Sequence, residues 1–133
     1  DELLCLTDLY ATFASITGEI PQAGGEDSFD LSRHLRGERA TEPIRDQIVH
    51  HSVRGFFAIR QGPWKLIMKR GSGGFTGPAS VEPKEGEPTG QLYHLERDPA
   101  ETTNVWAEHP EVVAHLEALL NAQRERGRSA PAR

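Results

Sequence analysis

Two adjacent histidines are the side chains of this sequence best suited to chemistry on a substrate. His50 and His51 lie in the run DQIVHHS, whose branched residues predict a β-strand. Neighbouring strand residues point to opposite faces, so the two imidazoles cannot bind one metal ion together. We therefore expect that at most one of them reaches a substrate, as a hydrogen-bonding group or general base, and that neither binds metal.

Four basic residues gather on and after a predicted hairpin. They are Arg60, Lys65, Lys69 and Arg70. They can guide an anionic substrate, although the solvated face of a strand shows the same pattern, and both interpretations stay open. The GSGG that follows is interpreted as a flexible loop, because no Lys-Ser/Thr comes after it as a phosphate-binding loop requires.

The remaining polar motifs favour structural roles. Cys5 lies in the leucine-rich run DELLCL without a positive neighbour to activate its thiol, which predicts a buried structural cysteine. The run RDPAETTN predicts a capped turn, in which Asp98 caps, Pro99 takes the first helical position and Glu101 reaches back to the Asp98 N–H. Asn104, which tolerates a left-handed φ, ends this turn. We expect no catalytic residue in the chain.

The elements that must position these residues predict an α+β fold. A helix is expected over 7–17 and a short one over 30–36, each followed by a glycine. Three β-type runs follow, and a fourth lies at 91–95 after a Gly/Pro/Glu-rich loop over 70–90. A helix over 110–126 carries an apolar stripe. We predict a four-stranded antiparallel sheet packed by this C-terminal helix, with an N-terminal helix beside it.

Local signals specify the central hairpin. The pair QG suits a tight turn with a positive φ at Gly62. In the strand after it, Trp64, Leu66 and Met68 alternate with other residues, so these three side chains should face the core.

Composition limits the class of protein. The chain has 133 residues and a net charge of −5, from 15 basic and 20 acidic residues, which argues against a dedicated nucleic-acid binder. The single cysteine excludes an internal disulfide. No run approaches the roughly 20 apolar residues of a membrane span. We expect neither nucleic acid nor membrane as a partner, and we interpret the chain as a fragment of a longer protein.

Four motifs follow one another along nearly the whole chain. They are Asp8, Leu9 and Thr12; Asp27, Ser28, Leu31, Leu35 and Gly37; Ala58, Arg60, Gly62, Trp64, Lys65 and Leu66; and Leu92, Tyr93, Leu95, Asp98, Pro99, Glu101 and Asn104. In this order they resemble the C-terminal region of type I sulfatases, arylsulfatase-like members of the alkaline phosphatase superfamily. One departure is the run EDS, where many relatives have Asp-Gly-x-Ser.

The resemblance implies that the full-length protein is a sulfatase whose chemistry lies elsewhere. In this family a Cys or Ser in a C-x-P-S-R or C-x-A-x-R context becomes formylglycine, and it acts beside Ca²⁺ in a large N-terminal catalytic domain. Cys5 is followed by Leu-Thr-Asp-Leu and does not match. Formylglycine and Ca²⁺ are therefore expected in that N-terminal domain, and the fragment alone should be inactive.

The resemblance also implies a division of the chain and a role for each part. Residues 1–46 would be a helical connecting segment from the end of the catalytic domain, 47–127 the C-terminal subdomain, and 128–133 a frayed tail. The subdomain would support the catalytic domain, its main partner, and help to wall the cleft for a sulfate-ester substrate. An apolar surface exposed in the fragment would allow a dimer. A periplasmic or secreted location is favoured by the resemblance.

By position, the substrate contacts are expected at His50 or His51, at Arg54, and in the loop that begins at Arg70. Two other interpretations stay open. The chain is either a subdomain of a phosphoesterase-type relative, with the same scaffold but a different nucleophile and metals, or a free-standing binding or assembly module that uses its exposed sheet.

Overall fold

The computed structural model describes residues 3–19, 23–38 and 42–131. It divides into two compact units, one made of Asp1–Ile48 with Gln123–Arg133 and the other of Val49–Ala122. We call them unit 1 and unit 2. The division expected from the sequence, at residues 46 and 127, stays a prediction.

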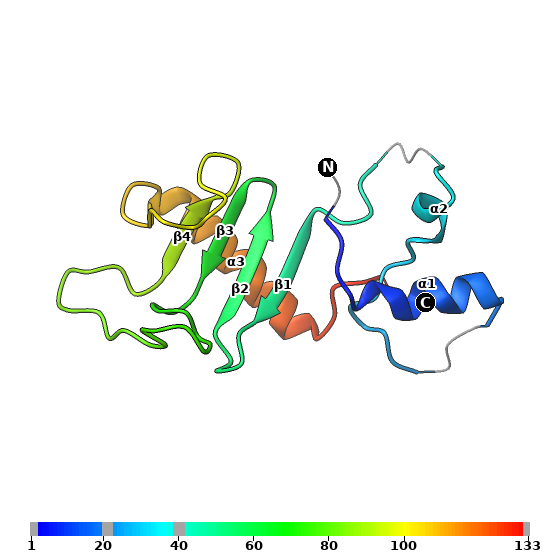
Figure 1. Cartoon of the computed structure of the whole chain (residues 1–133), viewed down its shortest axis with the longest axis horizontal. Helices are drawn as coiled ribbons and strands as arrows, with labels where there is room; N and C mark the ends of the chain where they lie inside the picture. The colour runs from blue at the N-terminus through cyan, green and yellow to red at the C-terminus, as the bar shows by residue number, and fades with distance from the viewer. Residues whose placement is uncertain (1–2, 20–22, 39–41, 132–133) are drawn as a thin grey trace. The chain divides into compact units, whose positions relative to one another are not determined.

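Unit 2 is built on an antiparallel sheet, whose first strand begins in unit 1. The strands are β1 (Gln47–His51), β2 (Phe57–Gln61), β3 (Trp64–Ile67) and β4 (Gln91–His94), in chain order across the sheet. Ile59 of β2 lies opposite Leu66 of β3, which in turn lies opposite Leu92 of β4. The helix α3 (Pro110–Arg126) crosses one face of the sheet (Figure 1). The predicted α+β fold is confirmed.

The core of unit 2 lies between the sheet and α3. Ile59, Leu66 and Leu92 are fully buried, and so are Leu116 and Leu120 of the helix. Each such side chain contributes about 1.5–3 kcal/mol when it leaves water. Trp64 and Met68 pack against this cluster, as the alternation in β3 predicts, and Gly62 has the expected positive φ of 53°.

Unit 1 contains α1 (Asp8–Thr17) and α2 (Ser32–Leu35). The buried side of α1 is its polar side, because Asp8, Ala11 and Thr12 are at most 4% exposed. Side chains join the helix to the chain that follows it. The Ala11 N–H donates to Ser28 Oγ at 2.8 Å, and the Leu31 N–H donates to Thr12 Oγ1 at 2.9 Å.

A buried ion pair holds the start of α1. The Asp8 carboxylate pairs with Arg45, whose side chain is 3% exposed. It also accepts hydrogen bonds from the N–H groups of Cys5, at 2.8 Å, and Phe29, at 3.0 Å. The Arg45 guanidinium lies 4.3 Å above the centre of the Phe29 ring, a cation–π contact. Arg45, which the sequence did not single out, therefore supplies the buried cation of unit 1.

The apolar side of α1 faces outward. The periodic apolar residues of this helix and its approach are all exposed, at Leu6, Leu9, Tyr10, Phe13 and Ile16. Their spacing correctly predicts a helix, whose last residue is followed by Gly18 in the left-handed conformation. It does not predict a face buried within this chain. Thr7 is the N-cap residue of the helix, but its side chain makes no capping hydrogen bond.

Two local expectations for unit 1 are wrong. Cys5 is half-buried, since its leucine neighbours point to the surface. The described part of the C-terminal segment does not fray, because Ser129 donates to Asp27 Oδ1 through its N–H at 2.8 Å and its hydroxyl at 2.7 Å. The N–H of Ala130 donates to the Glu26 carbonyl at 2.9 Å, and Ala130 is buried. None of the helices described has the length and hydropathy needed to cross a membrane.

We predict that Asp8→Asn lowers the free energy of unfolding of unit 1 by about 3–5 kcal/mol, because the buried Arg45 charge loses its anion. Urea denaturation, together with amide hydrogen exchange in α1, measures the loss. The matched control is Glu38→Gln, which breaks exposed ion pairs to Arg33 and Arg36 and should change stability little. An equal loss in both variants would contradict a dependence on burial.

Candidate functional site

The two adjacent histidines lie on opposite faces of β1, as the strand period predicts. Val49 packs against the core, so His51 shares its side of the sheet and His50 lies on the other. The His51 ring packs edge-on against Phe57, with 5.9 Å between ring centres, and its Nδ1 lies 2.9 Å from the Ser52 carbonyl oxygen. Whether either imidazole touches a substrate stays a prediction.

His50 lies near an ion pair that the sequence did not indicate. Lys65 Nζ donates to both carboxylate oxygens of Glu101, at 2.7 and 2.8 Å. Lys65 is paired in register with Arg60 and Tyr93, so the three side chains form a row on the face away from α3. Lys65 and Glu101 are separated by 36 residues. Each belongs to one of the four motifs, but nothing in the sequence indicated that the two would form a pair.

The charges of this row act on its titratable groups. Burial lowers the pKa of His50, the Lys65 charge lowers it further, and Glu101 acts in the opposite direction. Burial raises the pKa of the Tyr93 hydroxyl, and the Glu101 carboxylate adds to the effect. The lowered pKa of His50 favours its neutral imidazole, which can both donate and accept a hydrogen bond.

The turn that carries Glu101 differs from the predicted helix start. The Asp98 carboxylate does cap, accepting from the Thr102 hydroxyl at 2.9 Å and the Thr103 N–H at 2.8 Å, and hydrogen bonds from these two residues lower its pKa. No helix follows, however, and Glu101 reaches Lys65 instead of the Asp98 N–H. That N–H donates to the His94 carbonyl at 2.8 Å.

Glu101, not Asn104, adopts the left-handed conformation, with a φ of 55°. Asn104 has another role, because its Oδ1 accepts from the N–H groups of Leu92, at 2.9 Å, and Trp106, at 3.1 Å. Its Nδ2 donates to the Gly90 carbonyl at 3.1 Å. The asparagine thus joins the turn to β4, and the ion pair to Lys65 holds Glu101 in a conformation that costs energy for a residue with a side chain.

The two predicted arginines have different surroundings. Arg70 forms an ion pair with Glu87 within its own loop, so its charge is largely offset. Arg54 is exposed in the turn between β1 and β2, and its backbone N–H donates to the Gly73 carbonyl at 3.1 Å. Of the four cations gathered on the hairpin, Lys65 and Arg70 are therefore paired with carboxylates. The structure brings Arg54 close to the start of the long loop.

The long loop has a defined backbone, which changes our interpretation of GSGG as a flexible segment. Ser72 and Gly73 donate their N–H groups to the carbonyls of Pro78, at 3.0 Å, and Ala79, at 2.9 Å. Further along, the Val81 N–H donates to the Arg70 carbonyl at 3.0 Å. This ladder makes the segment a hairpin-like loop instead of a free tether.

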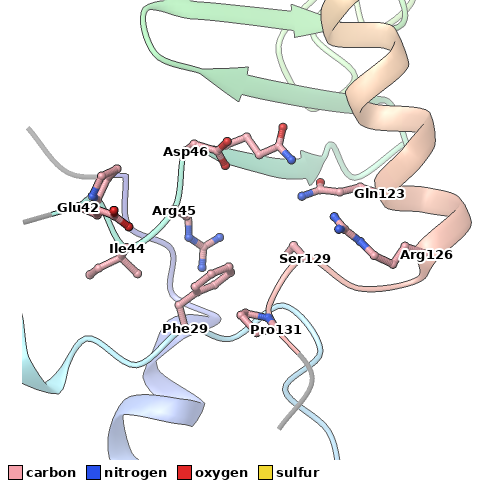
Figure 2. A pocket seen from close by; sticks show the side chains of 11 residues that line it. Phe29, Glu42, Ile44, Arg45, Asp46, Gln123, Arg126, Ser129 and Pro131 are labelled. Atoms are coloured by element: carbon pink, nitrogen blue, oxygen red, sulfur yellow. The ribbon is translucent and has the colours of Figure 1, made fainter.

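A pocket of about 500 Å³ lies in unit 1. Its walls are Phe29, Glu42, Pro43, Ile44, Arg45, Asp46, Gln47, Gln123, Arg126, Ser129 and Pro131. Figure 2 shows Gln123 and Arg126 extending from the end of α3 toward the segment of Arg45. Two arginines and two carboxylates line it, so its charge selects ions of neither sign. We did not predict this pocket, because its residues are far apart in the sequence and none belongs to a known site pattern.

The described residues do not fit the cofactors that the resemblance places elsewhere. Among residues 3–19, 23–38 and 42–131, no three His, Cys, Asp or Glu side chains gather in a group that could hold a metal ion. Cys5, in its Cys-Leu-Thr-Asp setting, is not in the sequence context from which formylglycine forms. Ligand contact by His50, His51 and Arg54 stays a prediction, and we derive no metal or nucleophile chemistry from this chain.

We predict opposite shifts of the pKa of His50 when its two charged neighbours are neutralised. Glu101→Gln should lower it further below the ordinary value of 6.5, and Lys65→Met should raise it. Nuclear magnetic resonance titration of the imidazole C–H signals measures both. Because the folded pKa is lowered, the unfolded chain binds more protons below pH 6.5, and stability is lost as the pH falls through this range.

The control for this titration is Glu111→Gln, which removes a carboxylate that is not among the charges acting on His50. It should leave the pKa of His50 unchanged. Shifts of the same sign in Glu101→Gln and Lys65→Met would show that the variants alter burial and not the local charge.

Comparison with known proteins agrees with the motif order. No protein-family model matches the chain. An N-acetylgalactosamine-6-O-sulfatase of Bacteroides thetaiotaomicron is 31% identical over 121 residues, which cover 90% of this chain and 23% of the relative. The chain thus spans about a quarter of the length of this relative.

Solved structures show the same fold. One comes from work on the metabolism of multiple glycosaminoglycans by Bacteroides thetaiotaomicron; it is 29% identical with a TM-score of 0.61, and the match covers 86% of this chain and 24% of that one. A second, solved with its substrate D-glucosamine-2-N,6-O-disulfate, is 20% identical with a TM-score of 0.62 over 89% of this chain and 23% of that one. In motif order, sequence and fold, the chain therefore matches the C-terminal region of type I sulfatases.

Proposed function

We propose that the chain is the C-terminal subdomain of an enzyme that hydrolyses sulfate esters of amino sugars. It would support an upstream catalytic domain and form part of the wall of the substrate cleft. The similarity to a sulfatase four times its length supports the first role. The name of that relative, and the disulfated glucosamine bound by a solved neighbour, support the substrate class. Supplying the nucleophile and the metal is the task of the upstream domain.

The observation that carries this proposal is the outward apolar face of α1. Phe13 is 57% exposed and Ile16 is 58% exposed, on a helix whose buried side is polar. Apolar side chains that recur on one side of a helix mark a surface that another part of a protein covers. In a sulfatase, the covering surface would be the catalytic domain, while in the isolated chain a second copy could take its place as a dimer.

On the substrate side, the proposal assigns contacts to the end of the sheet where β1 meets the long loop. Arg54 is exposed there, and its positive charge suits the negative charge of a sulfate ester. His50 or His51 would add a hydrogen bond from its own face of β1, and Arg70 would hold the loop through Glu87.

The same proposal says where the catalytic groups would lie. Formylglycine and Ca²⁺ would come from the catalytic domain, and the chain alone would hydrolyse no sulfate ester. A periplasmic or secreted location would give such an enzyme access to sulfated polysaccharides from outside the cell.

We predict that Phe13→Asp with Ile16→Asp reduces the binding of a hydrophobic dye by the isolated chain and shifts any dimer to monomer. In the complete enzyme, the same pair should weaken docking of the subdomain, since each side chain contributes at most about 1.5–3 kcal/mol on burial. Dye fluorescence, sedimentation and thermal unfolding measure these effects. Ala114→Asp with Ala118→Asp, at two exposed positions of α3, is the charge-matched control. Equal behaviour of the two variants would argue against a covered α1.

We predict that Arg54→Ala in the complete enzyme raises KM for a sulfated amino sugar by about tenfold, the loss of one charge-assisted hydrogen bond, without changing Tm. Arg33→Ala, which removes an exposed arginine of unit 1, should leave KM unchanged. Steady-state kinetics of the two variants measure KM. If alanine at Arg54, His50, His51 and Arg70 alters no kinetic constant, the chain does not wall the cleft.

A further inference from the structure

The most exposed large apolar side chain among the described residues is Phe75, at 97%. It lies near the tip of the loop between β3 and β4, in the run GSGGFTGP. A phenylalanine so placed adds nothing to the core, and an aromatic ring held in water is suited to bind something else.

The backbone around Phe75 is braced, so the ring is presented in a defined position. The backbone N–H groups of Ser72 and Gly73 donate to the carbonyls of Pro78 and Ala79. In addition, the Ser72 hydroxyl donates to the Thr76 carbonyl at 2.5 Å. The Gly74 N–H donates back to Ser72 Oγ at 3.1 Å. Phe75 therefore sits within a closed turn whose two sides are joined by hydrogen bonds, which reduces the entropy lost on binding.

This loop is packed against the turn between β1 and β2. The backbone N–H of Arg54 donates to the Gly73 carbonyl at 3.1 Å. A side chain at Gly73 would meet the Ser52 side chain and come within 2.8 Å of the Phe56 ring, so the close approach requires glycine. Both segments leave the sheet at the end where β1 and β3 finish (Figure 1). We call residues 52–56 with 72–78 the Phe75 rim.

The rim is cationic in an acidic chain. It contains Arg54 and no Asp or Glu, whereas the whole chain has a net charge of −5. Arg54 is an exposed residue, and none of the ion pairs found in the described part of the chain includes it. Val53, in the other segment of the rim, is also exposed, at 69%. An exposed ring, an exposed aliphatic side chain and an arginine without a carboxylate partner among the described residues thus lie on two segments that are hydrogen-bonded to each other.

We propose that the Phe75 rim binds a sugar ring that carries an anionic substituent, with Phe75 stacking on the apolar C–H face of the ring and Arg54 holding the anionic group. The chemistry of the rim matches such a ligand in both respects, since pyranose rings offer an apolar face and a sulfate offers oxygens for a guanidinium. This inference rests on the proposed function and adds to it a residue, Phe75, that recognises the sugar instead of the sulfate. Phe75 is a binding residue and takes no part in bond breaking.

The test titrates the full chain, labelled with ¹⁵N, with N-acetyl-D-glucosamine 6-sulfate. Expected are chemical-shift changes over 52–56 and 72–78, with weaker binding of unsulfated N-acetyl-D-glucosamine. Phe75→Ala should raise Kd for both sugars about fivefold to tenfold, while Phe75→Tyr keeps the ring and restores binding. Arg54→Ala should remove the preference for the sulfated sugar. Phe13→Ala, which removes an exposed aromatic ring from unit 1, is the matched control and should bind like the parent chain.

Two results would overturn the inference. One is an unchanged Kd for Phe75→Ala, with sodium sulfate alone reproducing the shifts, which would make the rim a simple anion site. The other is burial of the ring by protein in the complete enzyme, detected when a thiol reagent fails to label Phe75→Cys. Hydrolysis of sulfate esters by the complete enzyme tests the proposed function separately. If hydrolysis is observed but Phe75→Ala binds and turns over substrate normally, the proposed function stands and the rim does not bind sugar.

Discussion

The organisation of unit 1 depends on the buried contact between Asp8 and Arg45. A carboxylate and a guanidinium removed from water each lose several kcal/mol of solvation, which good geometry and further hydrogen bonds must offset. Asp8 meets this demand with two backbone N–H donors, and Arg45 with the Phe29 ring and the Asp27 carbonyl, 3.3 Å from its Nη2. One pair thus joins the start of α1, the loop after it and the approach to β1.

The motifs that led to the family are largely residues that bind one another. Thr12 and Ser28, from the first two motifs, each accept a backbone N–H of the other segment, and Asp27 holds the C-terminal segment through Ser129. Lys65 and Glu101 join the last two motifs as an ion pair. Residues with these roles specify a structure, which explains why they identify the region while its catalytic residues are sought elsewhere.

Periodicity predicted the strands, α3 and the hairpin, because these elements bury their apolar sides within the chain itself. The same argument fails for α1, whose apolar residues are spaced like a core face but lie in water. A sequence pattern reports that a face is covered, not by which molecule. The turn at Asp98 shows a second limit, since the capping pattern is local while the partner of Glu101 lies 36 residues away. Arg45 and its pocket carried no pattern at all. Among the candidate substrate contacts, neither the Lys65–Glu101 pair near His50 nor the approach of Arg54 to the long loop was visible in the sequence.

The outward apolar face of α1 also bears on the life of the polypeptide in a cell. A chain released with this face uncovered would present the kind of surface that chaperones hold and that proteases and aggregating partners find. Docking of the subdomain onto the catalytic domain would then determine the lifetime of the protein as well as its activity, because chains with an uncovered helix would be degraded. The helix would in this way act as a quality-control tag, hidden once the protein is assembled correctly.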